Sequence, residues 1–209
     1  ATPGDMLFAL TEQGIYDPPG GVDNVPPVIS SLVAPELTTG PSVAIAVYAE
    51  DNTAVTDVKA GTDLAGAEWQ PYTGSPTVLD VPLSLPGGEK TVRIRVRDES
   101  GNTADASVTV MYDAEPPEIS YFAPSSAAVF SPDVEFSVIA SDDCGVAEVM
   151  LCDDPNFAGA SWSRYQSSVV FTLSGQGERT VYAKVRDSAG RESEAVSATV
   201  RYLAPAFNP

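Results

Sequence analysis

Apolar and polar residues alternate with a period of two along most of this chain. In residues 43–49 the alternate positions Val43, Ile45, Val47 and Ala49 share one face, and residues 134–140 repeat this pattern. A period of two puts alternate side chains on the same face of an extended strand, so it predicts half-buried antiparallel strands. Stretches rich in Gly, Pro and Ser, such as residues 85–88 and 174–177, predict turns between them. The pattern therefore predicts an all-β chain with about seven short strands in each half.

The two halves of the chain repeat one another. The sequence TVRIRVRDESGN at 91–102 corresponds to TVYAKVRDSAGR at 180–191, so Asp98 recurs as Asp187, 89 positions later. That spacing matches the length of one small β-sandwich domain and indicates a tandem duplication. Further matching pairs lie around these segments: Pro26-Pro27 with Pro116-Pro117, Trp69 with Trp162, Tyr72 with Tyr165, and Tyr112 with Tyr202.

The duplication predicts two tandem immunoglobulin-like β-sandwiches with a short N-terminal extension, which is either a helix or a strand. In the strand at 91–97, Val92, Ile94 and Val96 are expected to face the core, and the arginines between them the solvent. The expected divisions are an N-terminal docking segment and linker at 1–25, a first domain at 26–113, a second domain at 114–203 and a C-terminal tail at 204–209.

Three short motifs stand out in the repeats. They are Val-x-x-Lys/Arg-Val-Arg-Asp-x-x-Gly before the final strand, Trp-x-x-Tyr upstream of it, and Asp-Asp-x-Gly-Val at residues 142–146. Over about residues 26–203 the chain thereby resembles the bacterial immunoglobulin-like, or fibronectin-III-like, repeats of secreted and surface-anchored proteins. The resemblance implies an extracellular or cell-surface location and a role as spacer, stalk, adhesin module or structural subunit. In the first repeat Ala54 replaces the glycine of the third motif, which speaks against a positive φ there.

The charge and the lack of histidine exclude several functions. The chain has 29 acidic and 11 basic residues, a formal net charge of −18 at pH 7, and no histidine. Such a charge would repel a phosphate backbone or an anionic membrane, so no nucleic-acid partner is expected. Without histidine, Ser/His/Asp and Cys/His catalysis and histidine-ligated zinc are excluded, and we do not expect an enzyme. The longest apolar run, at 43–49, is far shorter than the roughly 20 residues of a membrane-spanning helix, so no membrane span is expected.

Acidic and amide side chains concentrate in loops that an immunoglobulin-like topology brings to one end of each sandwich. The loops after the second and sixth strands lie at the same end, where the first strand also begins. Oxygen-only clusters are the ligands that calcium prefers, so calcium is the one cofactor that the sequence points to. The alternative is that these residues only form turns. The expected ligands are Asp51, Asn52, Asp98 and Asn102 in the first repeat, and Asp113, Glu115, Asp142, Asp143 and Asp187 in the second.

The sequence leaves the state of its two cysteines open. An exported protein would ordinarily pair Cys144 with Cys152. An unbroken strand between them, at roughly 3.3 Å per residue, would separate them by about 26 Å, whereas a disulfide needs Cα atoms about 4.4–6.8 Å apart. Either the segment turns back near Glu148, or the cysteines are free or bridge two chains.

Two aromatic pairs follow the third predicted strand of the repeats. Trp69 and Trp162 each precede a tyrosine by three residues, Tyr72 and Tyr165. We expect each tryptophan ring to close one flank of its core. The alternative is that these four residues contact a ligand, as aromatic platforms do for sugars.

The first residues belong to neither repeat. Residues 2–5 have the form of a helix start and Gly14 that of a helix stop, although an extended strand is the alternative. Met6, Leu7, Phe8 and Leu10 are too apolar to remain in water, so we expect them to be buried. They pack either on the first repeat or, as an assembly contact, in another subunit.

The leading interpretation is a non-enzymatic extracellular structural protein: a tandem immunoglobulin-like subunit of a pilus-like filament or other cell-surface assembly. Its expected partners are copies of itself or another surface subunit. The alternatives are an adhesive or carbohydrate-binding module, or spacer repeats of a larger surface protein.

Overall fold

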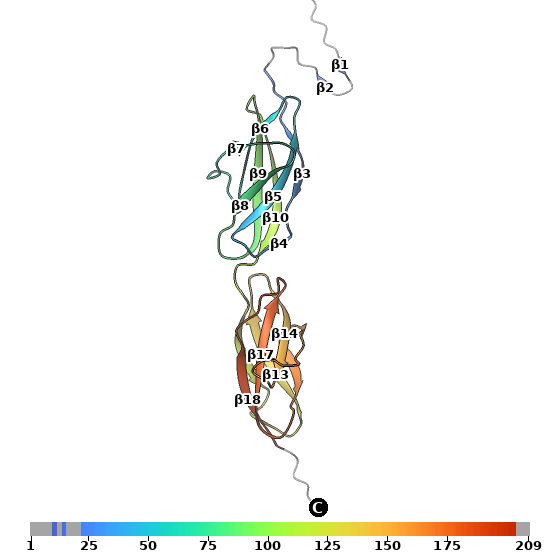
Figure 1. Cartoon of the computed structure of the whole chain (residues 1–209), viewed down its shortest axis with the longest axis vertical. Helices are drawn as coiled ribbons and strands as arrows, with labels where there is room; N and C mark the ends of the chain where they lie inside the picture. Colours follow the sequence, from blue (N-terminus) through green and yellow to red (C-terminus); the bar gives the residue numbers. More distant parts are fainter. Residues whose placement is uncertain (1–9, 12–13, 16–21, 204–209) are drawn as a thin grey trace, which may run out of the picture. The chain divides into compact units, whose positions relative to one another are not determined.

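A computed structural model describes residues 10–11, 14–15 and 22–203 of the chain (Figure 1). Among these residues there are strands, turns and bends but no helix. None of the described segments is therefore a helix of the length and apolar character needed to cross a membrane.

Eight strands build each repeat. The first repeat contains β3 (Val28–Val33), β4 (Leu37–Thr38), β5 (Ser42–Glu50), β6 (Val55–Gly61), β7 (Gln70–Pro71), β8 (Thr77–Pro82), β9 (Gly88–Asp98) and β10 (Thr103–Tyr112). The second contains β11 (Glu118–Pro124), β12 (Ala128–Val129), β13 (Asp133–Ser141), β14 (Val146–Cys152), β15 (Ser163–Arg164), β16 (Ser168–Thr172), β17 (Gly177–Asp187) and β18 (Val196–Tyr202).

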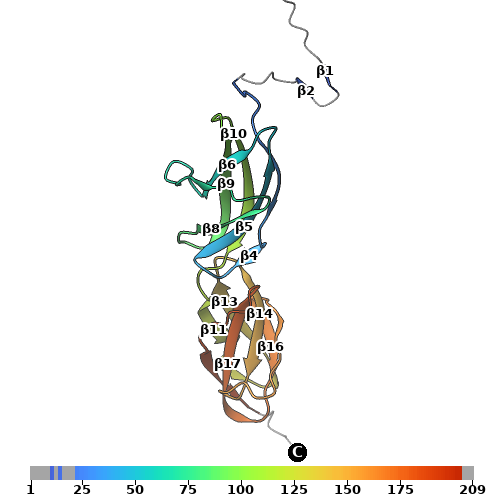
Figure 2. The same cartoon turned by 45° about the horizontal axis from the view of Figure 1, so that its top comes forward.

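Each repeat folds into a sandwich of a three-stranded and a five-stranded sheet (Figures 1 and 2). The strand orders are β3-β5-β8 and β4-β10-β9-β6-β7 in the first repeat, and β11-β13-β16 and β12-β18-β17-β14-β15 in the second. This is the immunoglobulin-like arrangement, in which strands A, B and E face strands G, F and C. The all-β class and the two immunoglobulin-like sandwiches predicted from the sequence are confirmed.

The count of eight strands arises because the first strand of each repeat changes sheets. β3 pairs antiparallel with β5, but the two residues of β4 pair parallel with the end of β10. The second repeat does the same, where β12 pairs parallel with β18. The other short strands, β7 and β15, lie at the edge of their sheets close in sequence to the tryptophans, and pair with β6 and β14.

The alternating residues fill the interior as predicted. Val92, Ile94 and Val96 of β9 are fully buried, whereas Arg93, between two of them, is exposed. In the second sandwich Val134, Phe136 and Val138 of β13 are buried, and the ring of Phe136 stacks on that of Phe122 at 5.2 Å between centroids.

By compactness the chain divides into two units. One comprises Ala44–Val81, Val92–Val108 and the described residues up to Ala34. The other comprises Pro35–Val43, Pro82–Thr91 and the described residues from Thr109 onward. The second unit thus contains the second sandwich, the linker after Tyr112 and three segments of the first repeat, the third of which is the end of β10. The domain boundary between residues 113 and 114 stays a prediction.

One tyrosine in each repeat ties a strand of one sheet to a strand of the other. Tyr165 follows β15, and its hydroxyl accepts a hydrogen bond from the Ala140 backbone N–H at 3.1 Å and donates one to the Val138 carbonyl at 3.0 Å. In the first repeat the Tyr72 hydroxyl accepts from the backbone N–H of Ala49 at 2.8 Å. Because a partly buried hydroxyl bridges the sheets, these tyrosines have a structural role.

We predict that Tyr165→Phe lowers the free energy of unfolding of the second sandwich by about 1–2 kcal/mol, because the Ala140 N–H loses its acceptor. Urea unfolding of the full chain measures the change. Tyr121→Phe is the matched control, because Tyr121 is 52 % exposed, and its effect should stay within about 0.5 kcal/mol. Equal effects of the two substitutions would contradict the structural role of Tyr165.

Candidate functional site

The same tight loop follows β9 and β17. The backbone N–H of Asn102 donates to Asp98 Oδ1 at 2.8 Å, and the N–H of Asp98 donates to the Asn102 carbonyl at 3.1 Å. The corresponding bonds join Arg191 and Asp187 at 3.0 and 3.1 Å. Gly101 and Gly190, with φ of 91° and 88°, supply the left-handed conformation that the loop needs. One carboxylate oxygen of each aspartate is therefore used to hold its loop.

The loops between the second and third strands of the sandwiches also turn around an aspartate. Asp51 Oδ2 accepts the backbone N–H of Thr53 at 3.0 Å, and Asp142 Oδ1 accepts that of Cys144 at 2.8 Å. The second loop continues through Gly145 at φ 90°, whereas among the described non-glycine residues only Phe157 has a positive φ. The first repeat, with Ala54, thus makes its turn without a positive φ.

These loops bring three aspartates together in each repeat. One oxygen from each of Asp23, Asp51 and Asp98 lies within 4.8 Å of the others, and the same holds for Asp113, Asp142 and Asp187. We call these the first and the second triad. Their members correspond in the duplication, and each triad lies within a single compact unit.

The other expected ligands take different places. Asn52 and Asn102 act as hydrogen-bond donors to the first triad rather than as members of it. Asp143 groups with Asp113 and Cys144, and Glu115 is exposed and belongs to neither triad. Asp23 was not among the expected ligands, and its signal in the sequence is its alignment with Asp113, three residues before the double proline of each repeat.

In the first triad, neighbouring donors satisfy every carboxylate oxygen except Asp51 Oδ1, which is buried without a partner among the described residues. Asp23 accepts hydrogen bonds from the Val25 backbone N–H at 3.0 Å, from the Thr53 hydroxyl at 3.1 Å and from the Asn52 amide at 3.3 Å. These bonds, that from Val25 above all, lower the pKa of Asp23. The side-chain amide of Asn102 donates to Asp98 Oδ2 at 2.8 Å.

In the second triad, carboxylate oxygens are left without donors. Asp113 is fully buried and Asp187 is 2 % exposed. The Oδ2 atoms of Asp113, Asp142 and Asp187 are all buried and have no hydrogen-bond partner among the described residues. A buried, unpartnered carboxylate oxygen is costly because it has lost its water without gaining a donor.

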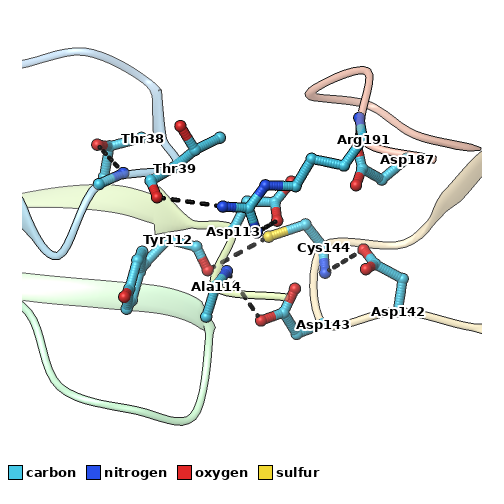
Figure 3. Close-up of polar contacts among 11 residues, drawn as sticks. Thr38, Thr39, Tyr112, Asp113, Ala114, Asp142, Asp143, Cys144, Asp187 and Arg191 are labelled. Atoms are coloured by element: carbon cyan, nitrogen blue, oxygen red, sulfur yellow. Dashed lines mark hydrogen bonds and ion pairs between the residues drawn. The ribbon is translucent and has the colours of Figure 1, made fainter. Parts of the chain in front are cut away.

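Arg191 supplies the positive charge next to this triad. Its Nη1 lies 3.1 Å from Asp113 Oδ1, and its Nη2 donates to the Thr39 carbonyl at 3.3 Å (Figure 3). Even so, the pKa of Asp113 is raised, because its burial and the charge of Asp187 outweigh the attraction of Arg191. Burial likewise raises the pKa of Asp142.

Both cysteines are free, and β14 runs unbroken from Val146 to Cys152 between them. The Cys144 thiol points to the Tyr112 carbonyl, with Sγ 3.4 Å from the oxygen (Figure 3). Burial, followed by the charge of Asp143, raises the pKa of Cys144 to about 11. The first alternative, a chain that turns back so that Cys144 and Cys152 form a disulfide, is therefore wrong.

The tryptophans lie on the outer face of the five-stranded sheets. The ring of Trp69 lies 4.5 Å from the Arg97 guanidinium carbon and 5.0 Å from the Lys59 ammonium, measured from the ring centroid. The ring of Trp162 lies 4.6 Å from Arg186. The expectation that these rings close a flank of the core is wrong. The rings lie against Lys and Arg side chains on the outer face of the sheet instead of against core residues. That Trp69, Tyr72, Trp162 and Tyr165 contact a ligand stays a prediction.

The expected assembly contact lies mostly outside the described residues, which do not include Met6, Leu7 and Phe8. Leu10 belongs to β1 (Leu10–Thr11), which pairs antiparallel with β2 (Gly14–Ile15). Of the two forms considered for this segment, the described part adopts the strand.

No protein-family model and no curated protein matches the chain. Solved structures similar to it include the fibronectin(III)-like modules of Clostridium thermocellum CbhA, with 14 % identity and a TM-score of 0.40 over 88 % of this chain and 97 % of that one. Others are the D00-D0 domain of intimin, with 12 % identity and a TM-score of 0.41 over 85 % and 98 %, and DIP-gamma IG1+IG2, with 12 % and 0.47 over 87 % and 99 %. These neighbours are immunoglobulin-like and fibronectin-III-like domains. The fold itself follows from the strand order.

We predict that Asp98→Ala destabilises the first sandwich by about 1–3 kcal/mol, because the partly buried N–H and amide of Asn102 both lose their acceptor. Chemical unfolding in chelator-containing buffer measures the loss. Glu99→Ala, in the same loop but exposed, removes the same charge and should change stability by less than about 0.5 kcal/mol. If both variants unfold alike, Asp98 does not hold the loop.

Proposed function

We propose that the chain is a non-enzymatic structural module of an extracellular, cell-surface assembly. In this proposal, copies associate when the N-terminal segment of one adds as a strand to an open sheet edge of another. More specifically, we propose that repeated association of this kind forms a filament. The observation that supports the proposal is that the edge strand β16 is unprotected.

β16 is an open edge of its three-stranded sheet in the described part of the chain. Its sequence, Ser-Val-Val-Phe-Thr, contains no charge and no proline, and Val170 is 67 % exposed. Proteins usually protect an edge strand with a charge, a proline or a bulge, because unpaired backbone groups accept a further strand. An unprotected edge of this kind supports strand addition from a partner.

The edge strand β8 of the first sandwich is protected by comparison. Pro76 precedes it, Pro82 ends it, and the side chain of Asp80 is exposed in its middle. Because proline has no N–H to donate and a charge resists burial against a neighbour, β8 is the poorer acceptor. This contrast favours β16 as the recipient strand.

The proposed donor is the segment around Met6, Leu7, Phe8 and Leu10. Full burial of such side chains contributes on the order of 1.5–3 kcal/mol each. The strand form of β1 is the form that backbone pairing with an edge requires. Together, side-chain burial and main-chain hydrogen bonds would exceed the ordering cost of association.

Deletion of residues 1–20 should leave both sandwiches folded and abolish assembly, because it removes the donor segment. Sedimentation of the full-length and truncated chains measures assembly, and circular dichroism with thermal melting checks the fold. A truncated chain that still polymerises, or a full-length chain that stays monomeric at high concentration, would favour a spacer or binding module instead.

Val170→Lys should also weaken assembly, because it places a charge on the recipient edge. The matched control is Val78→Lys on the edge strand β8, since Val78 is comparably exposed at 63 %. Dynamic light scattering of both variants across a concentration series gives the comparison. Assembly that responds to the Val78 substitution and not to the Val170 substitution would refute β16 as the recipient.

A further inference from the structure

The geometry points to a calcium-binding site at the second triad, formed by Asp113, Asp142 and Asp187, with the first triad as its metal-independent counterpart. The site lies within the second compact unit and does not depend on the proposed assembly role. It uses the buried Oδ2 atoms of the three aspartates, all of which lack a partner among the described residues.

The duplication provides an internal comparison between the two triads. In the first repeat, Asn52, Thr53 and Asn102 donate hydrogen bonds to the aspartates. The corresponding positions of the second repeat hold Asp143, Cys144 and Arg191. One donor has thus become a further carboxylate, and another a thiol directed at the Tyr112 carbonyl. The second triad retains the carboxylates but has lost the neutral donors that satisfy them.

The positive charge of Arg191 does not neutralise the three carboxylates of the second triad. Arg191 pairs with Asp113 Oδ1 and leaves the Oδ2 atom of every member without a donor. Carboxylates held within 4.8 Å of one another repel, and burial strengthens that repulsion because the surroundings screen it poorly. A divalent cation would remove both the repulsion and the unsatisfied oxygens.

The donor set fits calcium. Calcium binds carboxylate and carbonyl oxygens at about 2.3–2.6 Å, so two ligands on opposite sides of the ion lie about 5 Å apart. The spacing of the triad oxygens, within 4.8 Å, falls inside this limit. Asp142 and Asp187 already use Oδ1 to hold their loops, so Oδ2 is free to face an ion without disturbing the turn. The Cys144 Sγ is directed at the Tyr112 carbonyl, so the set formed by the three aspartates contains oxygen atoms only and suits a hard cation.

The test measures the melting temperature of the full chain in EDTA and in calcium chloride, with calorimetric titration of calcium. At a calcium concentration of a hundred times Kd we expect a rise in Tm of about 10 °C for the transition of the second unit. The expected stoichiometry is one ion per chain.

Asp142→Asn should have opposite effects in the two buffers. Its amide oxygen can still accept the Cys144 N–H, so the loop is kept, while one buried charge is removed. The variant should therefore melt above the wild type in EDTA but show at least a tenfold loss of calcium affinity. Asp63→Asn is the control, because Asp63 holds a similar turn through the Ala65 N–H at 2.9 Å but lies outside both triads.

Two further variants locate the site. Asp51→Asn in the first triad should leave the calcium response unchanged. Arg191→Met, which removes the competing positive charge and adds no hydrogen-bond donor, should raise calcium affinity several-fold. No calcium heat and equal Tm values in both buffers would overturn the proposal. So would a calcium response that survives Asp142→Asn or disappears with Asp51→Asn.

Discussion

The loop end of each sandwich depends on one buried carboxylate, that of Asp98 or Asp187. Each accepts the backbone N–H of the residue four positions later and thereby closes the turn between the last two strands. This turn also requires a glycine in the left-handed conformation, which Gly101 and Gly190 provide. The aspartate also becomes one corner of an acidic triad. A residue that the fold needs for its turn thus also contributes one carboxylate to the acidic triad.

The sandwiches could be predicted from the sequence because their determinants are local. Alternation in 43–49 and 134–140 sets the faces of β5 and β13, and the repeat gives the length of each domain. The change of sheets between β3 and β4 could not be predicted, because two residues carry no periodicity. The position of Trp69 was missed for a related reason: its partners, Lys59 and Arg97, come from two strands that pair only in the folded chain.

The sequence predicted where the acidic residues of each repeat gather. It did not predict that the two triads differ in how many of their carboxylate oxygens have hydrogen-bond donors. Topology alone places the aspartates of each repeat at one end of the sandwich, which is how Asp142 and Asp187 were found. Which of their oxygens are already used depends on donors at distances that only the structure supplies. The contrast between Asn102 and Arg191 is visible in the sequence, yet its meaning appears only once both residues lie beside their triads.

The surroundings of the Cys144 thiol lower its reactivity toward oxidants. Thiol oxidation and disulfide exchange proceed through the thiolate. With a pKa of about 11, only about one Cys144 side chain in a thousand is ionised at pH 8. The burial of Cys144 and the negative charge of Asp143 beside it therefore make this thiol slow to react. A free thiol that would be a liability on an exposed surface is in this place chemically quiet.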